Sequence, residues 1–517
     1  MSATREADYG WTILPDRLPE SNLWLRDDPL EDWNGKRVIV IGAARQGLAL
    51  TRYLALHGAE VVITDRLSAQ ELSPATLSLS DLPIQWVLGS HPLEILDRAD
   101  LVCPSGGVPL SLPIIEEARH RGIPLSNDSQ IFMESVTCPV IGITGSAGKT
   151  TTTALVGRMA HAAVDLLQER STDDLQFLKS GEVAFSRLPQ ARIWVGGNIG
   201  TPLISSVEQM QPGDLAILEL SSFQLEVMTR SPHVAAVLNI TPNHLDRHNN
   251  MATYSEAKAR ILKFQSSSDV AVLGRDDPGS WGLAGEAHGH VVTFGKEEPP
   301  TGVEGTYIGS DGSALMGRFA SADGELLLPL MPRERVTLRG EHNLANVLAA
   351  CAIAAAAGLP LEALQAGVEG FGGVPHRLEY VRTWRGADWY NDSIATAPER
   401  AMAAIRSFDE PLVLLAGGRD KNLPWDDFIK LVHERVGHLI LFGEAADTIR
   451  SAFAGTGPSQ VEIRRCEDLH AAVLAAAEVV KPGDVVLLSP GGTSYDAFRD
   501  FEERGEVYRR WVMELPE

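Results

Sequence analysis

Cysteine is scarce in this chain of 517 residues. The four cysteines, at positions 103, 138, 351 and 466, lie far apart, and no CxxC pair occurs. This spacing disfavours a zinc ribbon or a disulfide framework. We therefore expect buried, reduced thiols, as in a cytosolic enzyme.

Positive charge is also in short supply. The chain has 45 Lys and Arg against 68 Asp and Glu, a net charge of −23. A protein that binds nucleic acid or anionic membrane in general needs a basic face, so we expect no nucleic-acid partner. A local cationic cluster could still bind an anionic substrate.

Long hydrophobic runs are missing, although 44% of the residues are hydrophobic. No stretch approaches the roughly 20 apolar residues of a membrane span. The first residues, MSATREADYGW, lack the basic region and apolar run of a signal peptide. The sequence therefore predicts a cytoplasmic protein with no membrane span.

Three α/β domains are predicted, because a domain usually takes roughly 100–200 residues. Residues 36–65 have the pattern strand, glycine turn, amphipathic helix, strand, and an apolar strand at 138–144 starts a second such region. After a Gly/Pro junction at 371–379, repeated strand-then-glycine signals predict a doubly wound third domain. We expect a peripheral insertion at 161–192 and a β-ribbon at 300–330.

The predicted fold class is α/β, with a central P-loop ATPase-type domain built on a parallel sheet between two Rossmann-like domains. The expected boundaries are an N-terminal extension at 1–35, then domains at 36–137, 138–373 and 374–517.

The strongest motif is GSAGKT at 145–150, between an apolar strand and a predicted helix. Such a loop closes backbone N–H groups around phosphate oxygens, and the helix N-terminus adds a favourable dipole. It is a near match to the Walker pattern, which would need glycine where Ile143 stands. The strand–loop–helix context disfavours a chance glycine-rich turn. The predicted nucleotide-binding residues are Gly145, Ser146, Ala147, Gly148, Lys149, Thr150 and Thr151.

Three ionisable residues are further candidates. Glu219 ends an apolar strand, where a P-loop protein needs a carboxylate on the metal side; a surface carboxylate is the alternative. His244 follows another apolar strand, and a solvated loop histidine fits that position equally well. Lys258 lies on a predicted helix, where the local pattern by itself favours a surface lysine.

A second glycine-rich turn, from Gly42 to Gly47, follows the first strand, and Asp65 ends the next strand. It resembles the GxGxxG fingerprint with Ala44 at the middle glycine. It suits any nucleotide diphosphate better than a nicotinamide cofactor, because the Ala44 methyl occupies a point of close backbone approach. A tight turn without a ligand is the alternative.

Nine strings in a fixed order are more specific than any one motif, and together they resemble the Mur ligase family. The resemblance runs from about residue 36 to the end and leaves out the 161–192 segment and parts of 300–330. ELSSFQLE and SYDAFRDFEERG are similar to the branch that adds D-glutamate. In order, the strings are GITGSAGKTTT, GGNIG, ELSSFQLE, LNITPNHLDRH, YSEAKARI, GEHNLANVLAA, VPHRLE, NDSIAT and LSPGGTSYDAFRDFEERG.

The resemblance implies an ATP- and Mg²⁺-dependent ligase of peptidoglycan synthesis, expected to be a monomer. ATP would phosphorylate the carboxylate of UDP-N-acetylmuramoyl-L-alanine, and the amine of D-glutamate would attack the acyl phosphate. The three domains would hold the uridine diphosphate, ATP and the amino acid in that order. Substrates in three domains imply domain closure.

The resemblance also implies roles for single residues. Lys149 would contact the γ-phosphate, Thr150 and Glu219 would hold one Mg²⁺, and His244 a second. Lys258 matches a carbamylated lysine that supports metal binding. Asn198 would face the reacting centre. Expected ATP contacts are Asn343, Asn346, Arg377 and Asp392; expected glutamate contacts are Thr396, Lys421, Ser494 and Phe501; expected uridine diphosphate contacts are Gly42, Gly47, Asp65, Arg66, Ser105 and Gly107.

Two positions depart from the family pattern. Ile394 stands where many members have lysine in DSKAT, so Lys421 or Arg419 would have to supply that cation. Gly106 replaces the proline of an SPGV loop. Other assignments stay open: an L-glutamate-adding ligase, another Mur-type or folylpolyglutamate-type ligase, a dinucleotide-dependent oxidoreductase and a non-catalytic nucleotide-binding scaffold.

Overall fold

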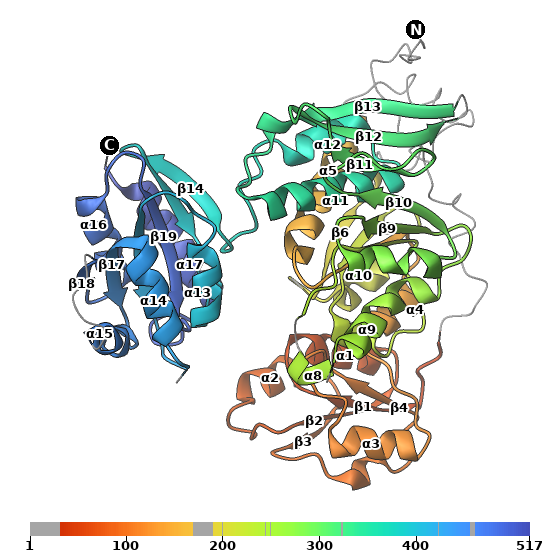
Figure 1. The fold of residues 1–517 in the computed structure, drawn as a ribbon. Helices are drawn as coiled ribbons and strands as arrows, with labels where there is room; N and C mark the ends of the chain where they lie inside the picture. Colours follow the sequence, from red (N-terminus) through yellow and green to blue (C-terminus); the bar gives the residue numbers. More distant parts are fainter. Residues whose placement is uncertain are drawn as a thin grey trace. The chain divides into compact units, whose positions relative to one another are not determined.

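The computed structural model describes residues 31–168, 190–198, 200–242, 245–248, 250–321, 324–421, 423–454 and 461–516. The predicted extension therefore lies outside the described residues except for 31–35. The chain separates into two compact units, the second formed by Thr337–Gly340 and Gly370–Glu517. The first unit holds two sheets and the second unit holds one (Figure 1).

The N-terminal sheet is parallel, in the order β3-β2-β1-β4. Because side chains alternate along a strand, Val38 and Val40 of β1 pack with Leu50 on one face while Ile39 and Ile41 pack with residues of α3 on the other. The predicted Rossmann-like arrangement is thus observed. Its elements are β1 (Arg37–Ile41), α1 (Arg45–Leu56), β2 (Glu60–Asp65), α2 (Ser73–Ser78), β3 (Gln85–Leu88), β4 (Leu101–Pro104) and α3 (Pro113–His120).

The central sheet has the strand order β13-β12-β11-β10-β9-β8-β5-β7-β6. Strands β6 to β11 are parallel, and β12 and β13 extend the sheet as an antiparallel ribbon, which confirms the ribbon and makes the sheet mixed. The strands are β5 (Val140–Thr144), β6 (Ile193–Gly197), β7 (Leu215–Glu219), β8 (Val234–Val237), β9 (Val270–Gly274), β10 (His290–Phe294), β11 (Glu304–Ile308), β12 (Ala314–Ser321) and β13 (Gly324–Pro332).

The helices around this sheet correct one expectation. Residues 161–168 are not part of an insertion, because α5 continues to Gln168 and buries Ala163, Val164 and Leu167 against the domain. Residues 169–189 lie outside the described residues. The helices are α5 (Lys149–Gln168), α7 (Ser222–Leu225), α8 (Leu245–His248), α9 (Met251–Lys263), α10 (Pro278–Trp281), α11 (Glu341–Ala356) and α12 (Leu361–Val368).

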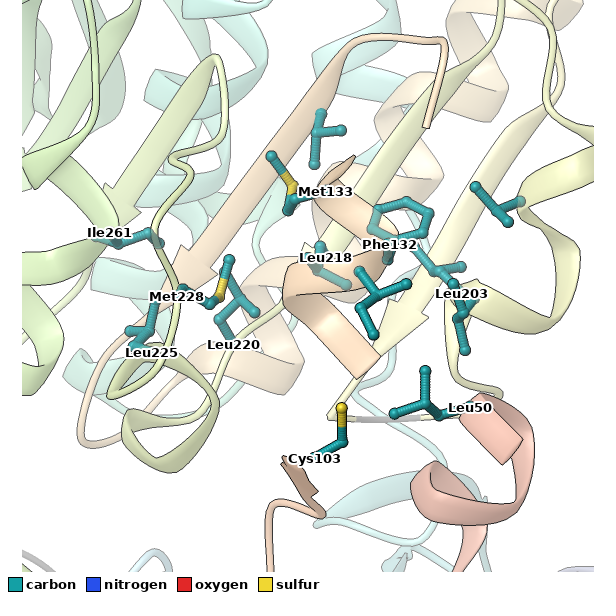
Figure 2. Packing of buried hydrophobic residues seen from close by; sticks show 14 of the residues in the cluster. Leu50, Cys103, Phe132, Met133, Leu203, Leu218, Leu220, Leu225, Met228 and Ile261 are labelled. Atoms are coloured by element: carbon teal, nitrogen blue, oxygen red, sulfur yellow. The ribbon is translucent and has the colours of Figure 1, made fainter. Parts of the chain in front are cut away.

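A single hydrophobic cluster joins the two sheets of the first unit, as Figure 2 shows from close by. Leu50 and Cys103 come from the N-terminal domain, Phe132 from α4 (Asp128–Ser135), and Leu203 and Leu218 from the central domain. All four cysteines are free and buried, as predicted. Within the described ranges, every helix is too short or too polar to cross a membrane.

The second unit is a doubly wound sheet in the order β14-β15-β19-β16-β17-β18, with only β14 antiparallel to its neighbour. Open α/β sheets bind ligands outside the carboxyl ends of their parallel strands. The elements are β14 (Glu379–Trp384), β15 (Ala387–Asn391), α13 (Pro398–Ile405), β16 (Leu412–Gly417), α14 (Asp426–Arg435), β17 (Val436–Phe442), α15 (Ala446–Ala454), β18 (Glu462–Arg465), α16 (Leu469–Val479), β19 (Val485–Gly491) and α17 (Phe501–Glu514).

Candidate active site

The phosphate loop connects β5 to α5 and allows no side chain at its last glycine. Gly148 has a φ of +82°, and a Cβ there would lie 2.2 Å from Asn346 Oδ1 on α11. A Cβ on Gly145 would lie 2.9 Å from the Cβ of Leu238. Both glycines are therefore needed for close packing, and the predicted ATP contact Asn346 lies beside the loop.

Asn239, which follows β8, holds the first half of this loop. Its side chain accepts from Ala147 N (2.8 Å) and donates to Ala147 O (3.1 Å), and its carbonyl accepts from Ser146 N (2.9 Å). In this arrangement the N–H groups of Ser146 and Ala147 bond to protein rather than to phosphate. Helix N-termini commonly bind anions, so the first turn of α5 is the part of this segment that suits a phosphate group.

The Ser146 hydroxyl is the second anchor of the loop. It donates to Thr241 O and accepts from Thr241 N and from the Tyr254 hydroxyl, each at 2.9 Å. Tyr254 is buried on α9. Sequence reasoning missed Asn239 and Tyr254, although both lie inside strings that carry the family resemblance.

Replacing Tyr254 by phenylalanine should loosen the loop without changing the core. The ring stays, and only the hydroxyl that donates to Ser146 is lost. A neutral hydrogen bond contributes roughly 1 kcal/mol, so we expect the KM for ATP to rise about 5-fold with kcat little changed. Steady-state kinetics measure this, with Tm as the control for folding. An unchanged KM for ATP would show that the Tyr254 hydroxyl does not hold the loop in its binding conformation.

Two lysines converge on one carbonyl of the loop. Lys149 Nζ and Lys258 Nζ donate to Gly145 O at 2.8 and 2.9 Å, and Lys258 is 1% exposed. Burial, together with the nearby Lys149 cation, lowers the pKa of the Lys258 amine to about 6, against an opposing effect of Glu219. Lys258 is therefore mostly a neutral amine at pH 7. The local pattern that favoured a surface lysine was wrong.

Glu219 is buried beside the loop. Strand β7 pairs with β5 so that Glu219 lies opposite Ile143. Its Oε1 accepts from Asn198 Nδ2 at 3.0 Å, and its buried Oε2 has no hydrogen-bond partner among the described residues. A buried carboxylate oxygen without a partner is costly, so this position suits a cation. Glu219 is not a surface carboxylate.

The donors near the loop fit a metal that is shared with a nucleotide. In the described part of the chain, no group of three His, Cys, Asp or Glu side chains could hold a metal ion. His244 lies outside the described residues. Mg²⁺ is commonly held by one or two carboxylates with phosphate oxygens and water. Glu219 and the half-buried Thr150 fit such a site.

In the N-terminal domain the structure brings four predicted residues together. A Cβ on Gly47 would lie 1.9 Å from Gly42 O, and Ser105 Oγ donates to that same oxygen at 3.0 Å. The Asp65 carboxylate accepts from Ala43 N (2.8 Å) and from Leu67 N (2.9 Å). Asp65 therefore holds the glycine turn directly.

A backbone hydrogen bond explains why glycine suits position 106, where the SPGV pattern has proline. The Gly106 N–H donates to Gln46 Oε1 at 3.3 Å, and proline has no N–H for this bond. Gly107 O accepts from Arg247 of α8 at 3.1 Å, so the loop also contacts the central domain. Arg66 is exposed next to the turn.

The helix α11 carries the two predicted asparagines. Asn346 is buried, and its Nδ2 donates to Asn343 Oδ1 at 3.1 Å. Both asparagines lie in the first two turns of α11, and Asn346 lies beside Gly148 of the phosphate loop.

The other predicted residues belong to the second unit. Asp392, just after β15, accepts from Ser489 Oγ at 2.8 Å, and burial raises the pKa of its carboxyl to about 7. Arg377 lies between His376 and Leu378, whose φ angles of 65° and 43° are unusual for these residue types. Thr396 is half-buried, Ser494 is buried, Lys421 is exposed, and Phe501 begins α17.

Two loops of this unit are fastened to each other. Arg419 N donates to Thr493 O at 2.7 Å, and Thr493 N donates to Arg419 O at 2.9 Å. The segments that carry Lys421 and Ser494 therefore start from the same point, at the carboxyl ends of β16 and β19.

Three family models together match about four-fifths of the chain. Residues 36–127 match the MurD-like N-terminal domain of Mur ligases, 143–354 the Mur ligase middle domain, and 376–492 the glutamate ligase domain. The crystal structure of MurF from Acinetobacter baumannii covers 98% of this chain and 99% of its own, with a TM-score of 0.50 at 16% identity, so it supports the fold alone.

Similar curated proteins extend over the same length. A UDP-N-acetylmuramoylalanine--D-glutamate ligase from Symbiobacterium thermophilum is 41% identical across 93% of this chain and 98% of its own length. One from Pelotomaculum thermopropionicum is 36% identical across 94% and 99%. The chain belongs to the Mur ligase family.

Proposed function

We propose that this chain joins D-glutamate to UDP-N-acetylmuramoyl-L-alanine in peptidoglycan precursor synthesis, with ATP converted to ADP and phosphate. Relatives with this activity in their names align with more than nine-tenths of the chain. The structural observation that carries the proposal is the group of Lys149, Lys258 and Glu219 at the phosphate loop. Such a cluster suits phosphoryl transfer to a carboxylate.

The reaction has to begin by activating the acceptor, because a carboxylate is a poor electrophile at neutral pH. A carboxylate oxygen attacks the γ-phosphorus, the bond from phosphorus to ADP breaks, and an acyl phosphate forms. Lys149 neutralises charge on the transferring group. The D-glutamate amine then attacks the acyl carbon, the carbon–oxygen bond breaks, and phosphate leaves as the amine loses its proton and the amide forms.

Lys258 is suited to become a carbamate. A neutral amine attacks CO₂ and loses a proton, which converts the side chain into an anion close to Glu219. The residues that would hold Mg²⁺ are Thr150, Glu219, carbamylated Lys258 and His244. When bound, Mg²⁺ would screen the repulsion between phosphate oxygens and the acceptor carboxylate.

The remaining roles follow from the family resemblance. We propose that Asn198, bonded to Glu219, faces the reacting centre. We keep the predicted contacts of Asn343, Asn346, Arg377 and Asp392 with ATP, of Thr396, Lys421, Ser494 and Phe501 with glutamate, and of Gly42, Gly47, Asp65, Arg66, Ser105 and Gly107 with the uridine diphosphate end. The domain boundaries after residues 35, 137 and 373, a monomer and a cytoplasmic location are parts of the same proposal.

Phosphate release with ATP, Mg²⁺ and UDP-N-acetylmuramoyl-L-alanine tests the function. Release should require D-glutamate, with a product mass equal to acceptor plus glutamate minus water. Release with L-glutamate only would identify the other glutamate-adding ligase. If no phosphate is released with either amino acid, the assigned amino-acid substrate is refuted, while nucleotide binding is unaffected.

A further inference from the structure

A buried arginine lies under the loops at the carboxyl edge of the second unit's sheet. Arg504 of α17 is 0% exposed. Its Nε donates to Ser393 Oγ (2.9 Å), its Nη2 to Ser393 O (2.8 Å), and its Nη1 to Gly492 O (3.1 Å). One guanidinium thus joins the segment after β15 to the segment after β19.

A third loop packs on the same group. Gly418, after β16, has a φ of +87°, and a Cβ there would lie 2.8 Å from Arg504 Nη1 and 2.3 Å from Thr493 O. Ser393 Oγ also donates to Phe501 O at 2.8 Å, which ties the start of α17 to the same point. These segments carry the four residues proposed to hold glutamate: Thr396, Lys421, Ser494 and Phe501.

The charge of Arg504 is not neutralised by an ion pair. Its hydrogen-bond acceptors are two carbonyls and a hydroxyl, and no carboxylate in the described part of the chain lies within ion-pair distance. Burial lowers the pKa of Arg504 to about 10, with Asp496 and Asp392 opposing, so the group stays charged at pH 7. A fixed positive charge in a buried position acts more strongly than one in water.

We propose that Arg504 is a positioning residue of the amino-acid subsite: it holds the 391–396, 417–421 and 491–494 loops in one arrangement and places a fixed positive charge beneath them. This inference rests on the proposed function, because it assumes that these loops take an amino acid with two carboxylates. Ile394 stands where many members of the family have lysine. Arg504 therefore supplies part of the positive potential that the two carboxylates of glutamate require.

The test replaces Arg504 by methionine and by lysine, with Arg510→Met as the control. Arg510 is an exposed arginine on the same helix. Arg504→Met should raise the KM for D-glutamate roughly 10-fold or more, because it removes charge-assisted hydrogen bonds. The KM for the acceptor, and acyl-phosphate formation in a single turnover at saturating ATP without glutamate, should stay unchanged. The KM for ATP should rise less than the KM for D-glutamate, because the proposed ATP contact Asp392 precedes Ser393 in one of the three loops. Arg504→Lys keeps the charge but cannot bond to both loops. Its KM for D-glutamate should lie between those of the wild type and Arg504→Met.

A milder variant covers the case in which Arg504→Met fails to fold. Ser393→Ala removes the hydroxyl that accepts from Arg504 and donates to Phe501 O, and should raise the KM for D-glutamate about 5-fold. Equal changes in all three KM values, or no change in the KM for D-glutamate, would overturn the positioning role. If the wild-type enzyme shows no D-glutamate-dependent phosphate release, the proposed function itself fails, which is a different result.

Discussion

Lys149→Ala should abolish acyl-phosphate formation while the protein stays folded. Lys149 begins α5 at the phosphate loop, and its ammonium already lies 2.8 Å from Gly145 O. A preorganised charge that stabilises a developing anion in a partly buried site contributes strongly to catalysis. Its removal should lower kcat by roughly 10³-fold, at the upper end of what single electrostatic contacts contribute.

The measurement for Lys149 is single-turnover ADP formation with the acceptor and without glutamate. The control is Tm, which should not fall, because the half-buried Lys149 side chain adds little to the core. Burial would still lower the pKa of the Lys258 amine in this variant, but the further lowering by the Lys149 cation would be lost. Normal turnover by this variant would refute the assigned phosphate role.

Lys258→Ala should lose most activity, about 10²-fold, and recover part of it with added short carboxylates such as acetate or formate. Lys258 is buried at the loop, and a carbamate there would supply an anion next to Glu219. Groups that support a metal site commonly contribute 10–100-fold to activity. A small carboxylate can enter the space left by the side chain and replace that anion.

The matched control is Lys263→Ala, an exposed lysine at the end of the same helix, which should remain fully active. The wild type should lose activity as the pH falls through about 6, because protonation of the Lys258 amine prevents its reaction with CO₂. Added bicarbonate should move this loss to lower pH. A fully active Lys258→Ala enzyme would show that carbamylation has no part in this reaction.

The phosphate loop could be predicted from the sequence because its chemistry is local. A glycine-rich turn between a buried strand and a helix is visible in consecutive residues, and the structure has β5, the loop and α5 in that order. Glu219 was found in the same way, as an acidic residue at a strand end. The register of β7 against β5 then explains why that end lies beside the loop.

Contacts between distant segments could not be predicted in this way. Lys258 looks like a surface lysine within its own helix, and it is buried only because α9 packs against the loop of β5. Asn239 and Arg504 bond to backbone atoms of other segments, and Tyr254 bonds to the Ser146 hydroxyl; no local spacing indicates such partners. Residues 161–168 were expected to belong to an insertion, yet they continue α5 and are partly buried against the domain.

The acceptor carboxylate should be phosphorylated before D-glutamate is added. The most direct test uses UDP-N-acetylmuramoyl-L-alanine with ¹⁸O in its carboxylate and follows the label by mass spectrometry. With D-glutamate present, the released phosphate should carry one carboxylate oxygen and the amide should keep the other. Released phosphate without ¹⁸O, alongside normal product formation, would contradict the acyl-phosphate route and the roles given to Lys149 and Lys258.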